Sequence, residues 1–157
     1  AEDGIRDVER SRGLGDVYKR QCVMICFDWW FPESARVLAL LGADIICHPA
    51  NLVLPDCQEA MKTRSLENGV FTITANRVGT EARGGKEPLT YTGESQIVGP
   101  RGRVIIRAGK GETGVFTADI DPEEARDKSI TARNHRFQDR RPQYYGPLTN
   151  PEINKSP

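Results

Sequence analysis

The sequence predicts a domain of the α/β class, in which strands and helices alternate along the chain. A continuous apolar run at 23–27 is the pattern of a strand buried on both faces of a sheet, and 44–48 and 70–75 are predicted as two further strands. Segments with helix start and stop signals separate these runs, so the order is strand, helix, strand, helix, strand. A length of 157 residues with 38% hydrophobic residues suits one ordinary soluble domain.

The predicted elements follow one another with short connections. Pro32 suits the first position of a helix over 32–41 that stops at Gly42, and a second helix over 58–68 stops at Gly69. We expect Pro49 to end the strand over 44–48. The remaining predictions are a glycine-rich loop at 79–87, a hairpin of strands at 94–98 and 103–107, a strand at 114–120, and a short helix capped by Asp121.

Charge and composition exclude several functional classes. With 22 basic and 22 acidic residues the chain lacks the basic surface of a nucleic-acid binder, and it has no apolar run of about 18 residues that would span a membrane. Its four cysteines form no CxxC pair and it has only two histidines, which argues against a disulfide scaffold or a zinc site. We therefore expect a cytoplasmic protein without a metal or a cofactor.

The N-terminal segment 1–21 has no apolar periodicity and resembles translated sequencing adapter. Residues 1–7 match a flow-cell adapter, and 11–21 match a transposase-end adapter when both are back-translated. The three residues between them fit a sample index in length. We therefore interpret 1–21 as an artefact, 22–146 as a partial domain whose N-terminal part is missing, and 147–157 as a C-terminal tail.

Cys26 is the candidate nucleophile. It lies at the carboxyl end of the first predicted strand, just before a helix, where open α/β folds bind their ligands. The Phe27 backbone N–H that follows is placed to stabilise an oxyanion. A thiol with a pKa of about 8.5 needs a base to become a nucleophile, and no histidine is evidently paired with it. Taken alone, a cysteine at a strand end is more often a small buried hydrophobe.

The residues around Cys26, and further short motifs in the same order, resemble the nitrilase superfamily of carbon–nitrogen hydrolases. The motifs are Cys26-Phe27-Asp28, Phe31-Pro32-Glu33-Ser34-Ala35-Arg36, His48-Pro49-Ala50-Asn51, Arg64-Ser65-Leu66-Glu67-Asn68-Gly69, Ala75-Asn76-Arg77-Val78-Gly79, Gly93-Glu94-Ser95 and Asp139-Arg140-Arg141-Pro142. The resemblance covers 22 to about 146. It implies a nitrilase-like αββα sandwich and a homo-oligomer.

The resemblance also implies a mechanism with a Glu-Lys-Cys triad, in which the glutamate takes the thiol proton and the lysine stabilises the charged intermediate. Only the cysteine, Cys26, is found here, since Glu33 and Glu67 match structural positions of the family and its other two triad members precede the nucleophile. We therefore expect the 157-residue chain by itself to be inactive. The alternative is a non-catalytic member that binds or scaffolds.

The expected substrate follows from the residues after the nucleophile. Carbamoyl-amino-acid hydrolases carry two arginines where this chain has Trp29 and Trp30, so a carboxylate clamp is replaced by flat apolar walls. We expect a small neutral or apolar amide, with carbamoyl amides and nitriles as alternatives. Asn51 is a further candidate for substrate contact, whereas His48 is interpreted as structural. Either tryptophan is also consistent with core packing.

Overall fold

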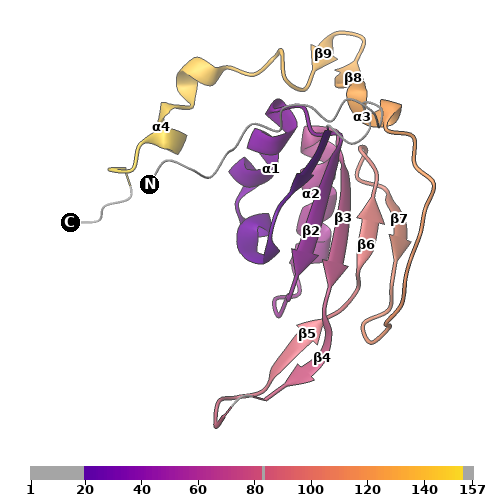
Figure 1. The fold of residues 1–157 in the computed structure, drawn as a ribbon. Coiled ribbons are helices and arrows are strands. Elements are labelled where there is room, and N and C mark those ends of the chain that lie inside the picture. The colour runs from indigo at the N-terminus through magenta and orange to yellow at the C-terminus, as the bar shows by residue number, and fades with distance from the viewer. Residues whose placement is uncertain (1–19, 83, 154–157) are drawn as a thin grey trace, which may run out of the picture. The chain divides into compact units, whose positions relative to one another are not determined.

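The computed structural model describes residues 20–82 and 84–153 (Figure 1). The chain divides into two compact units, Ala1–Asp127 and Lys128–Pro157. Most of the interpreted artefact, residues 1–19, lies outside the described residues, but Gln21 is the first residue of strand β1.

The first unit is built on a five-stranded sheet with the strand order β1-β2-β3-β6-β7. Strands β1, β2 and β3 are parallel, and β6 and β7 run antiparallel beside them. The strand bounds are β1 Gln21–Val23, β2 Ile45–Ala50, β3 Phe71–Asn76, β6 Gln96–Val98 and β7 Val104–Arg107. The predicted α/β class is therefore confirmed.

Two helices cover one face of this sheet (Figure 1). Helix α1, Pro32–Leu40, begins at the predicted proline, and helix α2, Cys57–Asn68, ends at Gly69, which has a φ of 58° in the left-handed region. The hydroxyl of Thr72 on β3 pairs with that of Ser65 on α2 at 2.8 Å, which identifies the helix-covered face. Because side chains alternate along a strand, Phe71 and Ile73 point to the opposite face.

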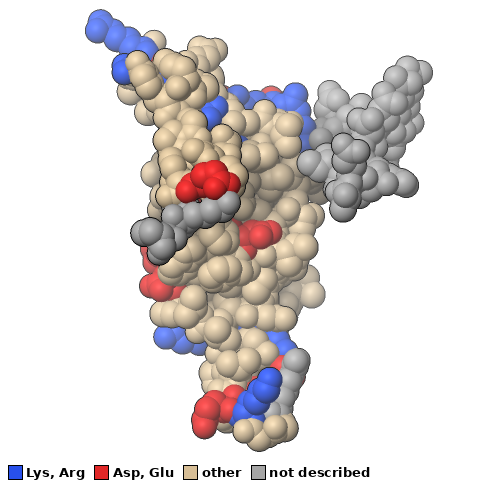
Figure 2. Space-filling view, turned by 90° about the vertical axis from the view of Figure 1, so that its left-hand side faces the viewer, with Lys and Arg blue, Asp and Glu red and all other residues tan. Residues whose placement is uncertain are grey.

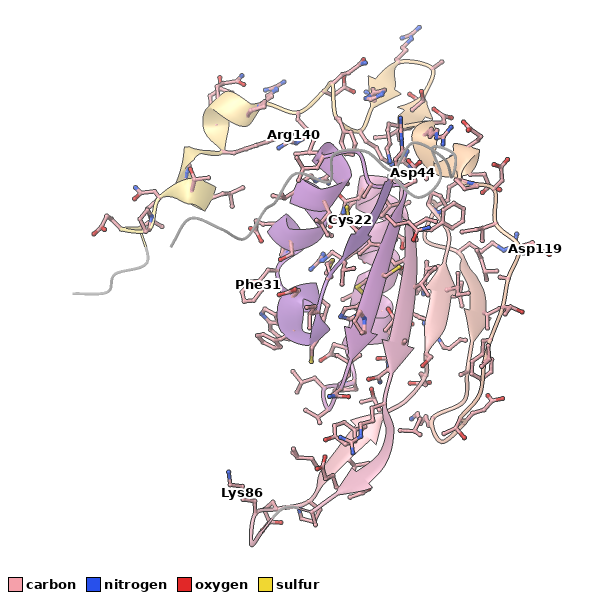
Figure 3. All side chains as sticks on the ribbon, in the orientation of Figure 1. Cys22, Phe31, Asp44, Lys86, Asp119 and Arg140 are labelled. Atoms are coloured by element: carbon pink, nitrogen blue, oxygen red, sulfur yellow. The ribbon has the colours of Figure 1, made fainter. Side chains whose placement is uncertain are left out.

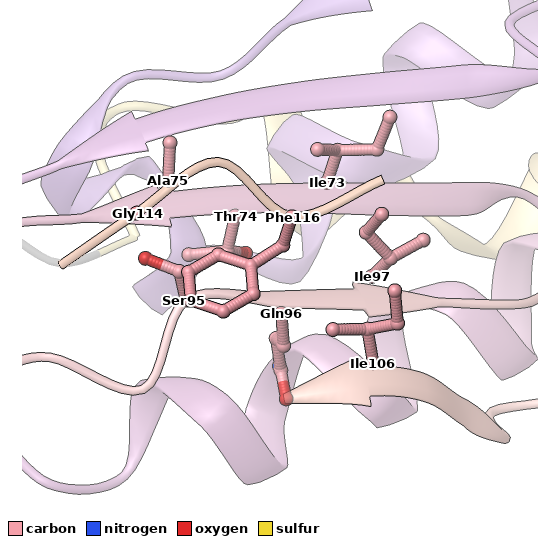
Figure 4. Close-up of a pocket in the computed structure, with 9 residues that line it drawn as sticks. All are labelled: Ile73, Thr74, Ala75, Ser95, Gln96, Ile97, Ile106, Gly114 and Phe116. Carbon is pink, nitrogen blue, oxygen red and sulfur yellow. The ribbon is translucent and has the colours of Figure 1, made fainter. Parts of the chain in front are cut away.

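That opposite face is covered by the segment that follows β7. Ile45, Phe71 and Ala125 form a buried apolar cluster there, against which Ile73 and Ile120 pack. A cavity of about 150 Å³ lies on the same face, lined by Ile73, Ile97, Ile106 and Phe116 among others (Figure 4). The described residues of this unit thus form one helix layer and one sheet, which are two of the four layers of an αββα sandwich.

Five predictions about local structure need correction. The first strand ends at Val23 rather than 27, and Cys26–Trp30 form a 3-10 helix. The first part of the loop predicted at 79–87 is strand, because β4, Val78–Glu81, pairs with β5, Leu89–Thr92, in a hairpin that extends beyond the carboxyl end of β3 (Figure 1). The segment 114–120 forms no strand within the described chain, because no neighbouring strand is present to pair with it.

The fourth correction concerns Pro49, which lies inside β2 instead of ending it. Met24 N donates to Cys47 O at 2.9 Å, so Cys47 faces β1 and Pro49, two residues on, faces the same side. Strand β1 has already ended there, so the missing N–H of Pro49 breaks no ladder hydrogen bond.

The short helix after 120 is α3, Glu123–Arg126. Its N-cap is Pro122 rather than the predicted Asp121, whose carboxylate still accepts the Glu123 N–H at 3.0 Å. Over residues 128–153, the second unit contains short elements. These are β8, Ser129–Thr131, β9, Asn134–His135, the 3-10 helix Pro142–Tyr144 and α4, Gly146–Thr149. The predicted tail therefore includes one helical turn.

Candidate active site

Cys26 occupies a sharp turn between β1 and α1. Its φ is +46°, in the left-handed region that residues with a side chain rarely adopt. The Asp28 carboxylate stabilises the turn by accepting the Ile25 N–H at 2.8 Å, while Asp28 N donates to Ile25 O at 3.1 Å. Asp28 thus braces the backbone directly before Cys26, which gives the third residue of the Cys-Phe-Asp motif a structural role.

The Phe27 backbone N–H is the predicted oxyanion donor. Within residues 20–82 and 84–153 it has no hydrogen-bond acceptor, and the Cys26 side chain beside it is only partly buried. A free donor next to an accessible sulfur is the arrangement that an acyl-transfer site needs. The catalytic roles of Cys26 and Phe27 stay predictions.

His48 contacts the backbone of Cys26 and is fully buried. Its Nε2 is 2.8 Å from the Cys26 carbonyl oxygen, and its Nδ1 is 3.3 Å from the Thr74 hydroxyl. Burial lowers the pKa of His48 from its ordinary value of 6.5, against the opposing effects of the Cys26 carbonyl and of Asp28. Both ring nitrogens are thus engaged, in agreement with its interpretation as a structural residue.

The aromatic residues that follow Cys26 form a cluster. Trp29 is only 4% exposed, whereas Phe27, Trp30 and Phe31 are about half exposed. The rings of Phe27 and Trp30 are stacked, with centroids 5.8 Å apart and an interplanar angle of 11°. In Figure 3, Phe31 lies beside the 3-10 turn, at the side of the sheet where β1 is the edge strand. Trp29 is therefore a core residue in this unit, and Trp30 presents the open aromatic face.

The loop after β2 carries Asn51, which is exposed. The role of Asn51 in substrate contact stays a prediction. Asn76, at the end of β3, holds this loop and was not predicted as a site residue from the sequence. The Oδ1 of Asn76 accepts the Leu52 N–H at 2.9 Å. Its Nδ2 donates to Thr92 Oγ1 at 2.8 Å and to Gly93 O at 2.6 Å. The Asn-Arg-Val-Gly motif was the available signal, because a short amide side chain at a strand end often bonds neighbouring backbone.

Glu67 and Cys57 lie on helix α2, and neither has the surroundings of a catalytic residue. Glu67 pairs with Arg64 at 3.3 Å, so it serves the helix α2 surface, in agreement with its exclusion as a general base. Cys57, the first residue of α2, is fully buried. Burial, with a contribution from nearby Cys26, raises its pKa to about 12 despite the opposing effect of Arg64. Cys57 therefore stays a neutral thiol, unlike a nucleophile.

Comparison with protein families shows which family the chain belongs to. The family model for carbon–nitrogen hydrolases matches residues 11–128, which include Cys26 and the entire five-stranded sheet. The chain belongs to the carbon–nitrogen hydrolase family. Over 123 residues it is 53% identical to a protein named nitrilase from Pyrococcus abyssi, a match that covers 78% of this chain and 45% of the relative.

Solved structures agree with this assignment to the carbon–nitrogen hydrolases. A carbon–nitrogen hydrolase from Helicobacter pylori superimposes with a TM-score of 0.70 at 26% identity, over 82% of this chain and 48% of the other. A mutant amidase from Nesterenkonia, with the acetamide moiety of fluoroacetamide added covalently at its active-site cysteine, matches with a TM-score of 0.51 at 29% identity, over 57% and 33%. The chain spans less than half the length of the curated relatives it matches.

Among the described residues, no helix has the length and apolar character needed to cross a bilayer.

Proposed function

We propose that this carbon–nitrogen hydrolase cleaves a non-peptide carbon–nitrogen bond of a small amide with Cys26 as its nucleophile. The observation that carries the proposal is the left-handed turn at Cys26, which leaves the thiol accessible beside the unengaged Phe27 N–H. In an acyl transfer, Sγ attacks the carbonyl carbon and the Phe27 N–H donates to the oxyanion. The amine then leaves with a proton, and water hydrolyses the thioester to release the acid.

The base that removes the thiol proton is proposed to be a glutamate assisted by a lysine, as the family resemblance implies. Residues 20–25 contain neither, and Glu67 is paired with Arg64. We therefore propose that the 157-residue chain alone is inactive and that turnover requires the protein expressed from its complete reading frame.

The substrate is proposed to be neutral, with an apolar acyl group. The stacked rings of Phe27 and Trp30 lie immediately after the nucleophile, and both are about half exposed. Flat apolar surfaces favour an apolar acyl group, and the adjacent tryptophans supply no fork of donors for a carboxylate. Propionamide is a suitable probe, and propionitrile and a carbamoyl amino acid distinguish the alternatives.

The decisive experiment uses the protein from the complete reading frame and measures the alkylation rate of each cysteine by iodoacetamide, followed by peptide mass spectrometry. We expect Cys26 to react first, and Cys47, which is also partly buried, is the matched comparison. The proposal fails if Cys26 reacts no faster than Cys47 or Cys57. In the protein from the complete reading frame, Cys26→Ala should abolish ammonia release from propionamide, whereas Cys47→Ala should retain it.

We further propose that the protein is a cytoplasmic homo-oligomer. Val37, Leu40 and Leu41, on α1 and at its end, are 53%, 42% and 72% exposed, which is the apolar surface that an association between helix layers would bury. Figure 2 shows one face of the molecule, on which broad areas carry no charged side chains. Light scattering of the purified protein tests this proposal, and a monomer at micromolar concentration refutes it.

A further inference from the structure

The conformation of Cys26 requires support from its neighbours. A left-handed φ of 46° at a residue with a Cβ is unfavourable and persists only where surrounding contacts hold it. Asp28 holds the peptide N–H of Ile25, which precedes the strained residue. On the other side of the strained residue, the Cys26 carbonyl oxygen lies 2.8 Å from Nε2 of His48, which is its hydrogen-bond partner.

The protonation of His48 follows from its two partners. A carbonyl oxygen only accepts, so Nε2 carries the proton that it shares with Cys26 O. The Thr74 hydroxyl, 3.3 Å from Nδ1, is then the donor to the unprotonated nitrogen. His48 is fully buried, and burial lowers its pKa and so disfavours the charged ring. In the neutral ring these two partners select one tautomer, held by a side chain from β3.

The geometry of the peptide group extends the effect of His48 to the oxyanion donor. The Cys26 carbonyl and the Phe27 N–H belong to one planar peptide unit, and the described chain has no cis peptide bond. In a trans peptide the N–H points opposite to the C=O. A side chain that fixes the Cys26 oxygen therefore also fixes the direction of the Phe27 N–H, on the far side of the peptide from the imidazole.

We propose that His48 is a positioning residue that, through its hydrogen bond to the Cys26 carbonyl, aims the Phe27 N–H at the oxyanion. The proposal rests on the proposed role of Cys26 as nucleophile. His48 donates no proton to the substrate and takes none from the thiol. Thr74 contributes by holding the required tautomer.

The first test compares substitutions in the protein from the complete reading frame, with ammonia release from propionamide as the assay. His48→Leu removes the donor, and kcat should fall by about 100-fold with little change in KM, as for loss of an oxyanion donor. His48→Gln keeps an amide N–H near the Nε2 position and should recover at least about ten-fold of that loss. An unchanged kcat in His48→Leu, or equal losses in both variants, overturns the proposal.

A matched pair on β3 tests the tautomer without replacing the imidazole. Thr72 and Thr74 are both buried on the helix-covered face, but Thr72 bonds Ser65 and Thr74 bonds His48. Thr74→Val should lower kcat by about five- to ten-fold, whereas Thr72→Val, which also loses one buried hydrogen bond, should leave kcat within about two-fold. Equal effects would mean that the loss reflects general destabilisation and would contradict the proposal.

A spectroscopic readout separates this proposal from the proposed function. In ¹⁵N-histidine-labelled protein, the ring signals that disappear in His48→Gln assign the His48 ring directly. At neutral pH we expect a proton on Nε2 and none on Nδ1, and Thr74→Val should alter this pattern. A proton on Nδ1 or a charged ring overturns the positioning role. Slow alkylation of Cys26 together with the expected tautomer would instead refute the nucleophile and leave the hydrogen bond intact.

Discussion

Gly93 links the hairpin of β4 and β5 to strand β6 of the five-stranded sheet, and replacing it with alanine provides a sharp test of the fold around the site. Its φ is +62°, its N–H donates to Arg77 O at 3.1 Å, and its carbonyl accepts the amides of Gln58 and Asn76. A Cβ at this position would overlap the Lys110 carbonyl oxygen and lie 2.8 Å from the Lys110 carbonyl carbon. The neighbour is backbone, which cannot rotate away.

The magnitude follows from two contributions. A left-handed residue with a Cβ costs about 1–2 kcal/mol. Displacing Gly93 from Lys110 also strains or breaks the hydrogen bonds of its carbonyl, each worth about 1 kcal/mol. We expect Gly93→Ala to lower the free energy of unfolding by about 3–4 kcal/mol.

Gly79 provides the matched control. Its φ is +89°, but no atom lies within 4 Å of an added Cβ, so Gly79→Ala should cost only about 1–2 kcal/mol of conformational strain. Urea unfolding followed by fluorescence of the two tryptophans measures both variants. If the two substitutions differ by less than about 1 kcal/mol, the steric reasoning is wrong.

Three further predictions concern the core, pH and the buried thiol. Ile46 is fully buried, whereas Ile105 is 39% exposed. Ile46→Ala should therefore lower the free energy of unfolding in urea by about 2–5 kcal/mol, and Ile105→Ala by less than about 1 kcal/mol. Equal losses would contradict the assigned core. The pKa of His48 is lowered by burial, so an unfolded chain binds a proton that the folded one does not, and stability should fall as pH drops below 6.5. His48→Gln should flatten this dependence of the unfolding free energy, and an identical slope would refute the assignment. Cys57, with its pKa raised to about 12, should be the slowest thiol to alkylate at pH 8 in the folded protein, and alkylation as fast as that of Cys47 would refute its burial.

Helices were predicted more accurately than strands, and the reason is physical. Pro32 and Gly69 act through their own backbone conformations, so α1 and α2 have the predicted beginning and end, respectively. A strand needs a partner elsewhere in the chain. The apolar alternation at 114–120 is real, but no strand lies beside it within the described residues.

The hairpin of β4 and β5 was missed for a related reason. Its polar residues near Gly79 have the composition of a loop, and the alternating Leu-Thr-Tyr-Thr of β5 was the unused signal. The hairpin is held by cross-strand contacts, such as the Tyr91 hydroxyl donating to the Glu81 carboxylate at 2.8 Å. Pairings between residues ten apart of this kind are not visible in local propensity.

At the candidate site, Cys26 could be identified as the candidate nucleophile from the sequence, because the Cys-Phe-Asp motif and the motifs around it are local patterns. The start of helix α1 could also be predicted from the sequence, because Pro32 favours the first position of a helix. The tertiary structure alone decided that Trp29 is buried while Trp30 is open, and that His48 bonds the Cys26 carbonyl across 22 residues of sequence. Helix starts and turns follow from the backbone preferences of single residues, whereas burial and long-range hydrogen bonds depend on which strands become neighbours.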